Sequence, residues 1–237
     1  MLLIYLIKLL LTNPVGFLIA IAVLIMPLLI SITIHEWSHG FAAYKFGDPT
    51  PKIQGRLSLN PFAHLDPVGT LMLLVVGVGW AKPVEINPAN INGRTKQMLV
   101  ALAGPLSNVI LAISFSIIAY SIFRFSGTSD NSESSIMYIF MSIFHMVIQI
   151  NIVLALFNML PIPPLDGSNI LKWLLPENLG NLYYSKLAPY GMFILLLILF
   201  TVGFKFVFNT ANMIEMYIFN ILEYIFNLFL SFIPVVN

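Results

Sequence analysis

A long apolar segment without charged residues dominates the amino-terminal part of the chain. No Asp, Glu, Lys or Arg occurs from Leu9 to Ile34, and the sequence HEWSH follows directly at residues 35–39. A helix that continues this segment would carry ionisable groups close to or into the hydrocarbon layer of a membrane, where they are costly and usually functional. We therefore expect the segment to span a membrane and to bring part of a functional site with it.

The HEWSH sequence places two histidines four residues apart. In a helix, His35 and His39 lie on one face and can bind one zinc ion, while Glu36 stays free to take a proton from water. This arrangement is typical of metalloproteases, although it fixes only three positions, and capping or core-polar roles are the alternative. The apolar setting favours the zinc site.

Composition places the whole chain among membrane proteins. Of its 237 residues, 59% are hydrophobic and 9% are charged, whereas soluble domains average roughly 45–50% and 25%. No polar linker divides the chain, so we expect one integral-membrane domain over residues 1–237. The formal net charge of +1 does not favour nucleic acid as a partner. Because the sequence contains no cysteine, nitrogen and oxygen atoms must hold any zinc.

The apolar stretches predict an all-α membrane protein, built as a multi-span helical bundle of four to five spans. The predicted spans are residues 14–44, 97–123, 134–160 and 187–204, and residues 210–233 would form a fifth span or an interfacial helix. Residues 46–95 are rich in turn residues, so we expect a re-entrant or small β element there, whose strand edges could bind an extended substrate. Residues 1–12 are too short to cross the bilayer and would lie at its interface or add strands.

The basic residues predict an orientation in the cell membrane. Residues 45–96 contain six Lys or Arg residues, whereas the loop between the second and third spans contains only Arg124. The positive-inside rule then places the helix ends that carry His39 and Asp166 on the cytoplasmic side. We expect a multi-pass protein whose active site faces the cytoplasm.

A catalytic zinc ion needs a third protein ligand in addition to the two histidines. The candidates are His64, His145 and Asp166. Asp166 follows a proline-rich break at residues 161–164 and lies at the predicted depth of His39, although it could instead cap the next helix. His64 could lie near the cavity or be structural, and His145 fits a hydrogen bond within the bundle better than a metal ligand.

Three motifs together resemble the site-2 protease family of intramembrane zinc metalloproteases. They are HEWSH at residues 35–39, GPLSN at residues 104–108 and NMLPIPPLDG at residues 158–167. The resemblance covers a catalytic core of about residues 15–175 and leaves extra helices at about 187–233. No long insertion separates the second and third spans, so the chain is similar to the compact branch without a PDZ domain.

The resemblance implies a role for each motif. Asp166 would be the third ligand of one Zn²⁺ per chain, and Glu36 would be the general base that takes a proton from the attacking water. The enzyme would hydrolyse a peptide bond in or near transmembrane segments of substrate proteins. Asn158 would contact the substrate backbone or the oxyanion, with an interhelical hydrogen bond as the alternative. Asn108 could do similar work or pack between helices, and His64 could act near the metal.

Two other functions fit part of the pattern. A membrane metal-ion carrier would also use intramembrane His, Glu and Asp residues, but it would leave the motif at residues 158–167 unexplained. A catalytically silent scaffold would be expected to lose Glu36 or a ligand, and all of them are present. The expected partners are the lipid bilayer and a transmembrane protein substrate, while the oligomeric state is open.

Overall fold

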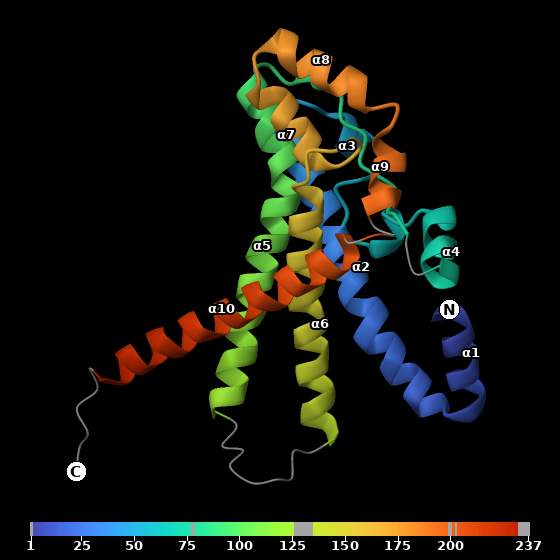
Figure 1. Ribbon diagram of the computed structural model, residues 1–237, viewed down its shortest axis with the longest axis vertical. Helices are drawn as coiled ribbons and strands as arrows, with labels where there is room; N and C mark the ends of the chain where they lie inside the picture. Colours follow the sequence, from blue (N-terminus) through green and yellow to red (C-terminus); the bar gives the residue numbers. More distant parts are fainter. Residues whose placement is uncertain (1, 77–78, 126–134, 199–200, 202, 232–237) are drawn as a thin grey trace.

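The computed structural model describes residues 2–76, 79–125, 135–198, 201 and 203–231, which are mostly helical (Figure 1). The α-helices are α1 Leu2–Thr12, α2 Pro14–Lys45, α3 Thr50–Ile53, α4 Pro67–Val76, α5 Arg94–Phe125, α6 Ser135–Asn158, α7 Asp166–Leu174, α8 Glu177–Leu187, α9 Gly191–Ile198 and α10 Phe204–Ser231. Two short 3₁₀ helices, η1 Pro61–Ala63 and η2 Pro88–Asn90, lie between α3 and α5.

Three of the described helices are long and apolar enough to cross a membrane. They are α2, α5 and the part of α6 from Met137 to Asn158. The 32 residues of α2 extend over about 48 Å at 1.5 Å per residue, which exceeds a hydrocarbon layer of roughly 30 Å. These helices correspond to the first three predicted spans, and the all-helical class is confirmed for the described residues.

Local sequence explains where α2 begins. The side chain of Asn13 accepts a hydrogen bond from the backbone N–H of Gly16 over 2.9 Å. Pro14 then occupies the first turn, where its missing N–H costs nothing. From this start, the helix continues past Pro27 to Lys45 and so carries the HEWSH motif in its last third.

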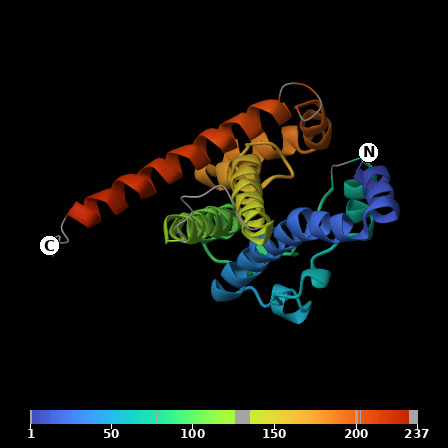
Figure 2. The same cartoon turned by 90° about the horizontal axis from the view of Figure 1, so that it is seen from below.

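Small buried side chains bring α5, α6 and α10 together. The core cluster consists of two alanines of α5, two isoleucines of α6 and one alanine of α10: Ala112, Ala119, Ile148, Ile152 and Ala211. Small residues allow helix backbones to approach closely in a membrane. As a result, α10 packs obliquely across α5 and α6 (Figures 1 and 2).

The remaining segments agree with expectation in part. Residues 1–12 are helical in the described part, as α1, and do not form a strand. Between the first two spans, the described residues contain short helices and one isolated antiparallel bridge between Leu65 and Ala81. Of the predicted span 187–204, α9 covers Gly191–Ile198, and residues 199, 200 and 202 lie outside the described part. Neither α9 nor α10 is among the three candidate spans.

Candidate active site

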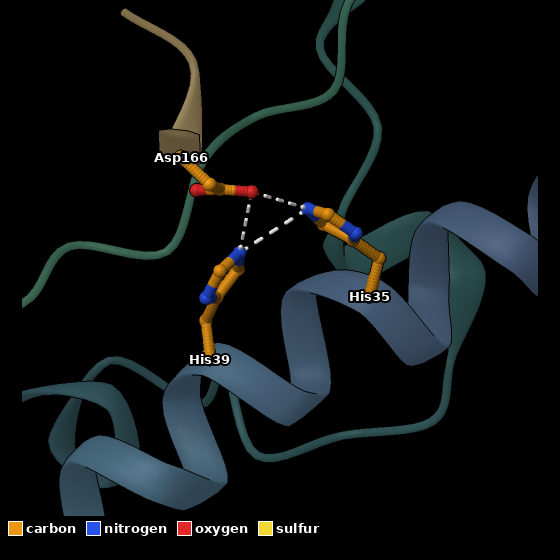
Figure 3. A group of neighbouring side chains, drawn as sticks. All are labelled: His35, His39 and Asp166. Atoms are coloured by element: carbon orange, nitrogen blue, oxygen red, sulfur yellow. Dashed lines mark hydrogen bonds and ion pairs between the residues drawn. The ribbon is translucent and has the colours of Figure 1, made fainter. Parts of the chain in front are cut away.

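His35 and His39 of α2 meet Asp166, the first residue of α7 (Figure 3). The two imidazole Nε2 atoms lie 3.2 Å apart, and each lies 3.2 Å from Oδ2 of Asp166. A tetrahedral zinc ion with bonds of about 2.0–2.1 Å places its ligand atoms about 3.3 Å apart. The triangle of nitrogen, nitrogen and oxygen therefore has the dimensions of one face of a zinc site.

Helix α5 orients both imidazoles through contacts to their Nδ1 atoms, on the side of each ring away from the triangle. Nδ1 of His35 lies 2.6 Å from Oδ1 of Asn108, and Nδ1 of His39 lies 2.8 Å from the backbone oxygen of Val100. The carbonyl of Val100 can only accept, so His39 donates from Nδ1. The amide nitrogen of Asn108 donates to Asn151, which leaves its oxygen to accept from His35. In the neutral rings, both Nε2 atoms then offer lone pairs to the centre of the triangle.

The carboxylate of Asp166 completes this set of electron-rich atoms. Burial raises the pKa of the Asp166 carboxyl, but imidazoles that carry a proton on Nε2, before any metal cation binds, lower it more strongly through the charge of His39 and the hydrogen bonds from both rings. This pKa therefore lies below its ordinary value. The carboxyl therefore stays ionised at neutral pH. Two imidazole lone pairs and one carboxylate within 3.2 Å require a proton or a metal cation between them.

Gly104 of α5 leaves the space that the two imidazoles fill. A Cβ atom at this position would lie 2.2 Å from Nε2 of His39 and 2.7 Å from Nε2 of His35. Val100, Gly104 and Asn108 follow each other at intervals of four residues, which places them on one side of α5. We call these three residues the α5 stripe. Its middle member admits only glycine, and its outer members bind the imidazoles.

Glu36 faces the same site from α2. Its Oε2 accepts a hydrogen bond from the backbone N–H of Val84 over 2.9 Å. Val84 belongs to residues 82–87, which form no helix in the structure and which we call the extended segment. The carboxylate that sequence reasoning assigns to proton transfer is therefore held in place by a main-chain donor.

Asp48 anchors the far end of the extended segment. Its carboxylate accepts hydrogen bonds from the backbone of Asn87 over 2.7 Å and from the side chain of Asn90 over 2.8 Å. Burial alone would raise the pKa of the Asp48 carboxyl. The hydrogen bonds from Thr50, Asn90 and Asn87 lower this pKa by more than burial raises it, so it lies below its ordinary value. The anchor connects the end of α2 to the segment that contacts Glu36.

A cleft of about 480 Å³ opens beside the triangle and Glu36. The extended segment lines one part of it, and α7 lines another. Asn158 also lines the cleft, and its amide nitrogen donates to the carbonyl of Leu154 over 3.0 Å. The contact of Asn158 with a substrate stays a prediction, because this hydrogen bond lies within its own helix.

The structure does not bring Asn108 or His64 into the cleft lining. Asn108 is fully buried and contacts His35 from the side opposite the triangle. His64 lies between α3 and α4 and is fully buried, and its Nε2 donates to the carbonyl of Ser58 over 2.8 Å. Neither side chain lines the cleft, and the oxyanion contact of Asn108 and the metal-proximal role of His64 stay predictions. His145, which binds Glu215 over 2.8 Å, also lies apart from the triangle.

Sequence reasoning missed the main-chain contacts and one arginine. Arg94, at the start of α5, donates to the carbonyls of Lys172 and Leu175 at the end of α7, over 3.0 and 2.5 Å, and packs on the ring of Trp173. It thereby fixes the helix whose first residue is Asp166. Backbone donors and acceptors have no sequence signature, and an isolated arginine in a basic stretch gives no sign of its partners.

Comparisons with known proteins point to one family. Residues 23–202 match the family model described as peptidase family M50. Two relatives share the name "Putative zinc metalloprotease". YwhC of Bacillus subtilis is 44% identical over 75% of this chain and 79% of its own length, and Rip2 of Mycolicibacterium smegmatis is 28% identical over 73% and 64%. The search of solved structures found no match.

Proposed function

The chain belongs to peptidase family M50, the site-2 proteases, and we propose that it hydrolyses peptide bonds in or near transmembrane segments of other proteins. The family membership makes it a metalloprotease of the site-2 type. The observation that supports a reaction at this place is the convergence of His35, His39 and Asp166 beside Glu36 in one cleft.

Each site residue has a role in this proposal. His35, His39 and Asp166 would hold one Zn²⁺ per chain, because their facing atoms match the spacing of zinc ligands. Zinc at this position would polarise the scissile carbonyl and lower the pKa of a water molecule to about 7. Glu36 would take the proton of the attacking water and pass it to the leaving amine nitrogen.

Two further groups would orient the substrate. Asn158 lines the cleft, and its carboxamide would contact the substrate backbone or the oxyanion. The extended segment offers main-chain groups to an unwound substrate strand, which would pair with it through backbone hydrogen bonds. Unwinding is required because the amides of a helix are hydrogen-bonded to one another and shielded.

The proposed setting is the cell membrane. The apolar helices and the family support a membrane protein. We propose that it is multi-pass, with one domain over residues 1–237, a catalytic core of about 15–175 and the active site towards the cytoplasm. α10 would add a further span or lie in the interface, and its exposed apolar side chains would contact lipid.

A cleavage assay in lipid vesicles tests this function. The full chain is reconstituted with a fluorescently labelled transmembrane substrate, with and without a zinc chelator, beside Glu36→Gln. We expect cleavage that the chelator abolishes and zinc restores, and that Glu36→Gln loses while it still binds zinc. Cleavage that neither treatment reduces would contradict the proposal. Zinc transport by Glu36→Gln without proteolysis in any variant would identify a metal-ion carrier instead.

A further inference from the structure

One side of α7 forms a row of polar groups that starts at the metal triangle. Asp166, Asn169 and Lys172 are three residues apart, so they lie along one side of the helix, and all three line the cleft. At 1.5 Å per residue, Lys172 lies about 9 Å along the helix axis from Asp166. The cleft wall therefore carries a cationic side chain whose backbone lies two turns along α7 from Asp166.

Lys172 lacks a counter-charge in the part of the chain that the structure describes. Its Nζ lies 4.8 Å from the ring centre of Trp173 and 4.8 Å from that of Tyr184. These aromatic rings attract the ammonium group and hold it beside the cleft, but they do not neutralise its charge. No carboxylate oxygen of the described residues lies within 4.0 Å of it.

The charges that line the cleft would leave one positive charge for a ligand. A zinc ion would bring two positive charges, and Asp166 and Glu36 carry one negative charge each. With both histidines neutral, these groups sum to zero, and Lys172 is the remaining charged group of the lining. A carboxylate that enters the cleft would therefore find an unpaired ammonium group rather than a balanced pair.

We propose that Lys172 binds a carboxylate of the substrate polypeptide and so sets where the enzyme cuts. An extended chain rises about 3.3 Å per residue, so the carboxylate would lie about three residues from the scissile bond. Asn169 lies between the two positions and would bind a substrate backbone group. This inference rests on the proposed proteolytic function and adds to it a preference for an acidic group.

A structural role for Lys172 makes a different prediction. A lysine in the last turn of a helix stabilises it through the helix dipole, and the backbone carbonyl of Lys172 already binds Arg94. Loss of that role would destabilise the enzyme and lower its activity by the same factor towards every substrate. Only a binding role predicts that the preference for one substrate charge over another depends on the charge at residue 172.

A charge-exchange experiment separates these roles. One transmembrane substrate is prepared with Glu, Gln or Lys at each of the second to fourth residues on either side of the cleaved bond. The enzyme is reconstituted in phosphatidylcholine vesicles. The kcat/KM of the unsubstituted enzyme is compared with those of Lys172→Glu and Lys172→Met at equal zinc content. Lys186→Glu is the matched control, because Lys186 is exposed on α8 and does not line the cleft.

We expect the unsubstituted enzyme to prefer Glu over Gln about tenfold at one position, as for a charge-assisted hydrogen bond. Lys172→Met should lose this preference, Lys172→Glu should prefer Lys, and Lys186→Glu should behave like the unsubstituted enzyme. A substrate truncated at the preferred position shows whether a chain-end carboxylate can replace a side-chain one. A preference for Glu that survives Lys172→Glu overturns the inference, whereas failure of the unsubstituted enzyme to cleave any substrate refutes proteolysis itself.

Discussion

Asn108 holds His35 by a hydrogen bond of 2.6 Å between its carboxamide oxygen and Nδ1 of the imidazole. Asn108 donates in turn to Asn151 over 2.7 Å, and Asn151 donates to the hydroxyl of Ser31 over 2.8 Å. The network is buried and connects α2, α5 and α6. One imidazole of the proposed zinc site is thus fixed by three helices at once.

Replacement of this contact should weaken metal binding without touching a ligand. We expect Asn108→Ala to lower zinc affinity about 10–100-fold, the usual effect of removing the partner of a metal-binding histidine. Competition with a chelator of known affinity measures the change. Ser121→Ala is the control, because that exposed hydroxyl binds only its own helix. Unchanged zinc affinity in Asn108→Ala would show that Asn108 does not orient the ring.

Gly104→Ala should damage the site by filling it. The added Cβ would lie 2.2 Å from Nε2 of His39, and the imidazole cannot move without leaving Val100. Overpacking of this kind predicts a loss of zinc affinity of at least about tenfold. Zinc content after purification and chelator competition measure it, with the exposed Leu106→Ala on the same helix as the control. A fully metallated and active Gly104→Ala would refute the close approach.

Val84→Pro should impair catalysis without loss of zinc. Proline has no N–H, so the hydrogen bond of 2.9 Å to Glu36 is lost, whereas Val84→Ala keeps it. We expect the single-turnover rate constant to fall at least about tenfold for Val84→Pro, because a charged partner loses its donor. Single-turnover kinetics at equal zinc content compare the two variants. Equal rates would show that the main-chain donor is not needed to position Glu36.

Arg94→Met should loosen the link between α7 and the metal site. Arg94 donates to the carbonyl of Leu175 over 2.5 Å, at the opposite end of the helix from Asp166. Without it, the position of Asp166 is less restricted, and we expect zinc to bind several-fold to about tenfold more weakly. The exposed Lys96→Met is the charge-matched control. If both variants bind zinc alike, the connection through α7 does not act on the ligand.

Asp48 should make the fold sensitive to acid. Its folded-state pKa lies below the ordinary value, so its contribution to stability is complete above the unfolded pKa of about 3.9 and is lost as the pH falls through the folded pKa. We expect the thermal midpoint of the unsubstituted protein to exceed that of Asp48→Asn at neutral pH, and the difference to shrink below about pH 4. Melting curves from pH 3 to 7 measure it, with exposed Glu177→Gln as the control. A difference that grows in acid would contradict this sign.

The family, the three long apolar helices and the pair of His35 and His39 were predictable from the sequence, because each depends on residue type at a fixed spacing. Asp166 was one of several candidate ligands, and the resemblance to the site-2 proteases singled it out. A polar group in an apolar helix stands out, and so does a carboxylate after a proline-rich break. The extent of helix between residues 46 and 95 was not predictable, because short turns there depend on long-range partners such as Asp48 and Asn87. The position of His64 outside the cleft likewise depends on how its loop folds back.

The α5 stripe has a consequence for how the enzyme is made. Its three residues touch the imidazoles only after α5 has docked against α2, and Asp166 arrives still later in the chain, on the far side of α6. A nascent chain that has completed only its first helices would thus lack both the orienting groups and the last ligand. Metal binding would then come at the end of folding, and an incompletely synthesised protease would be unable to cleave other membrane proteins.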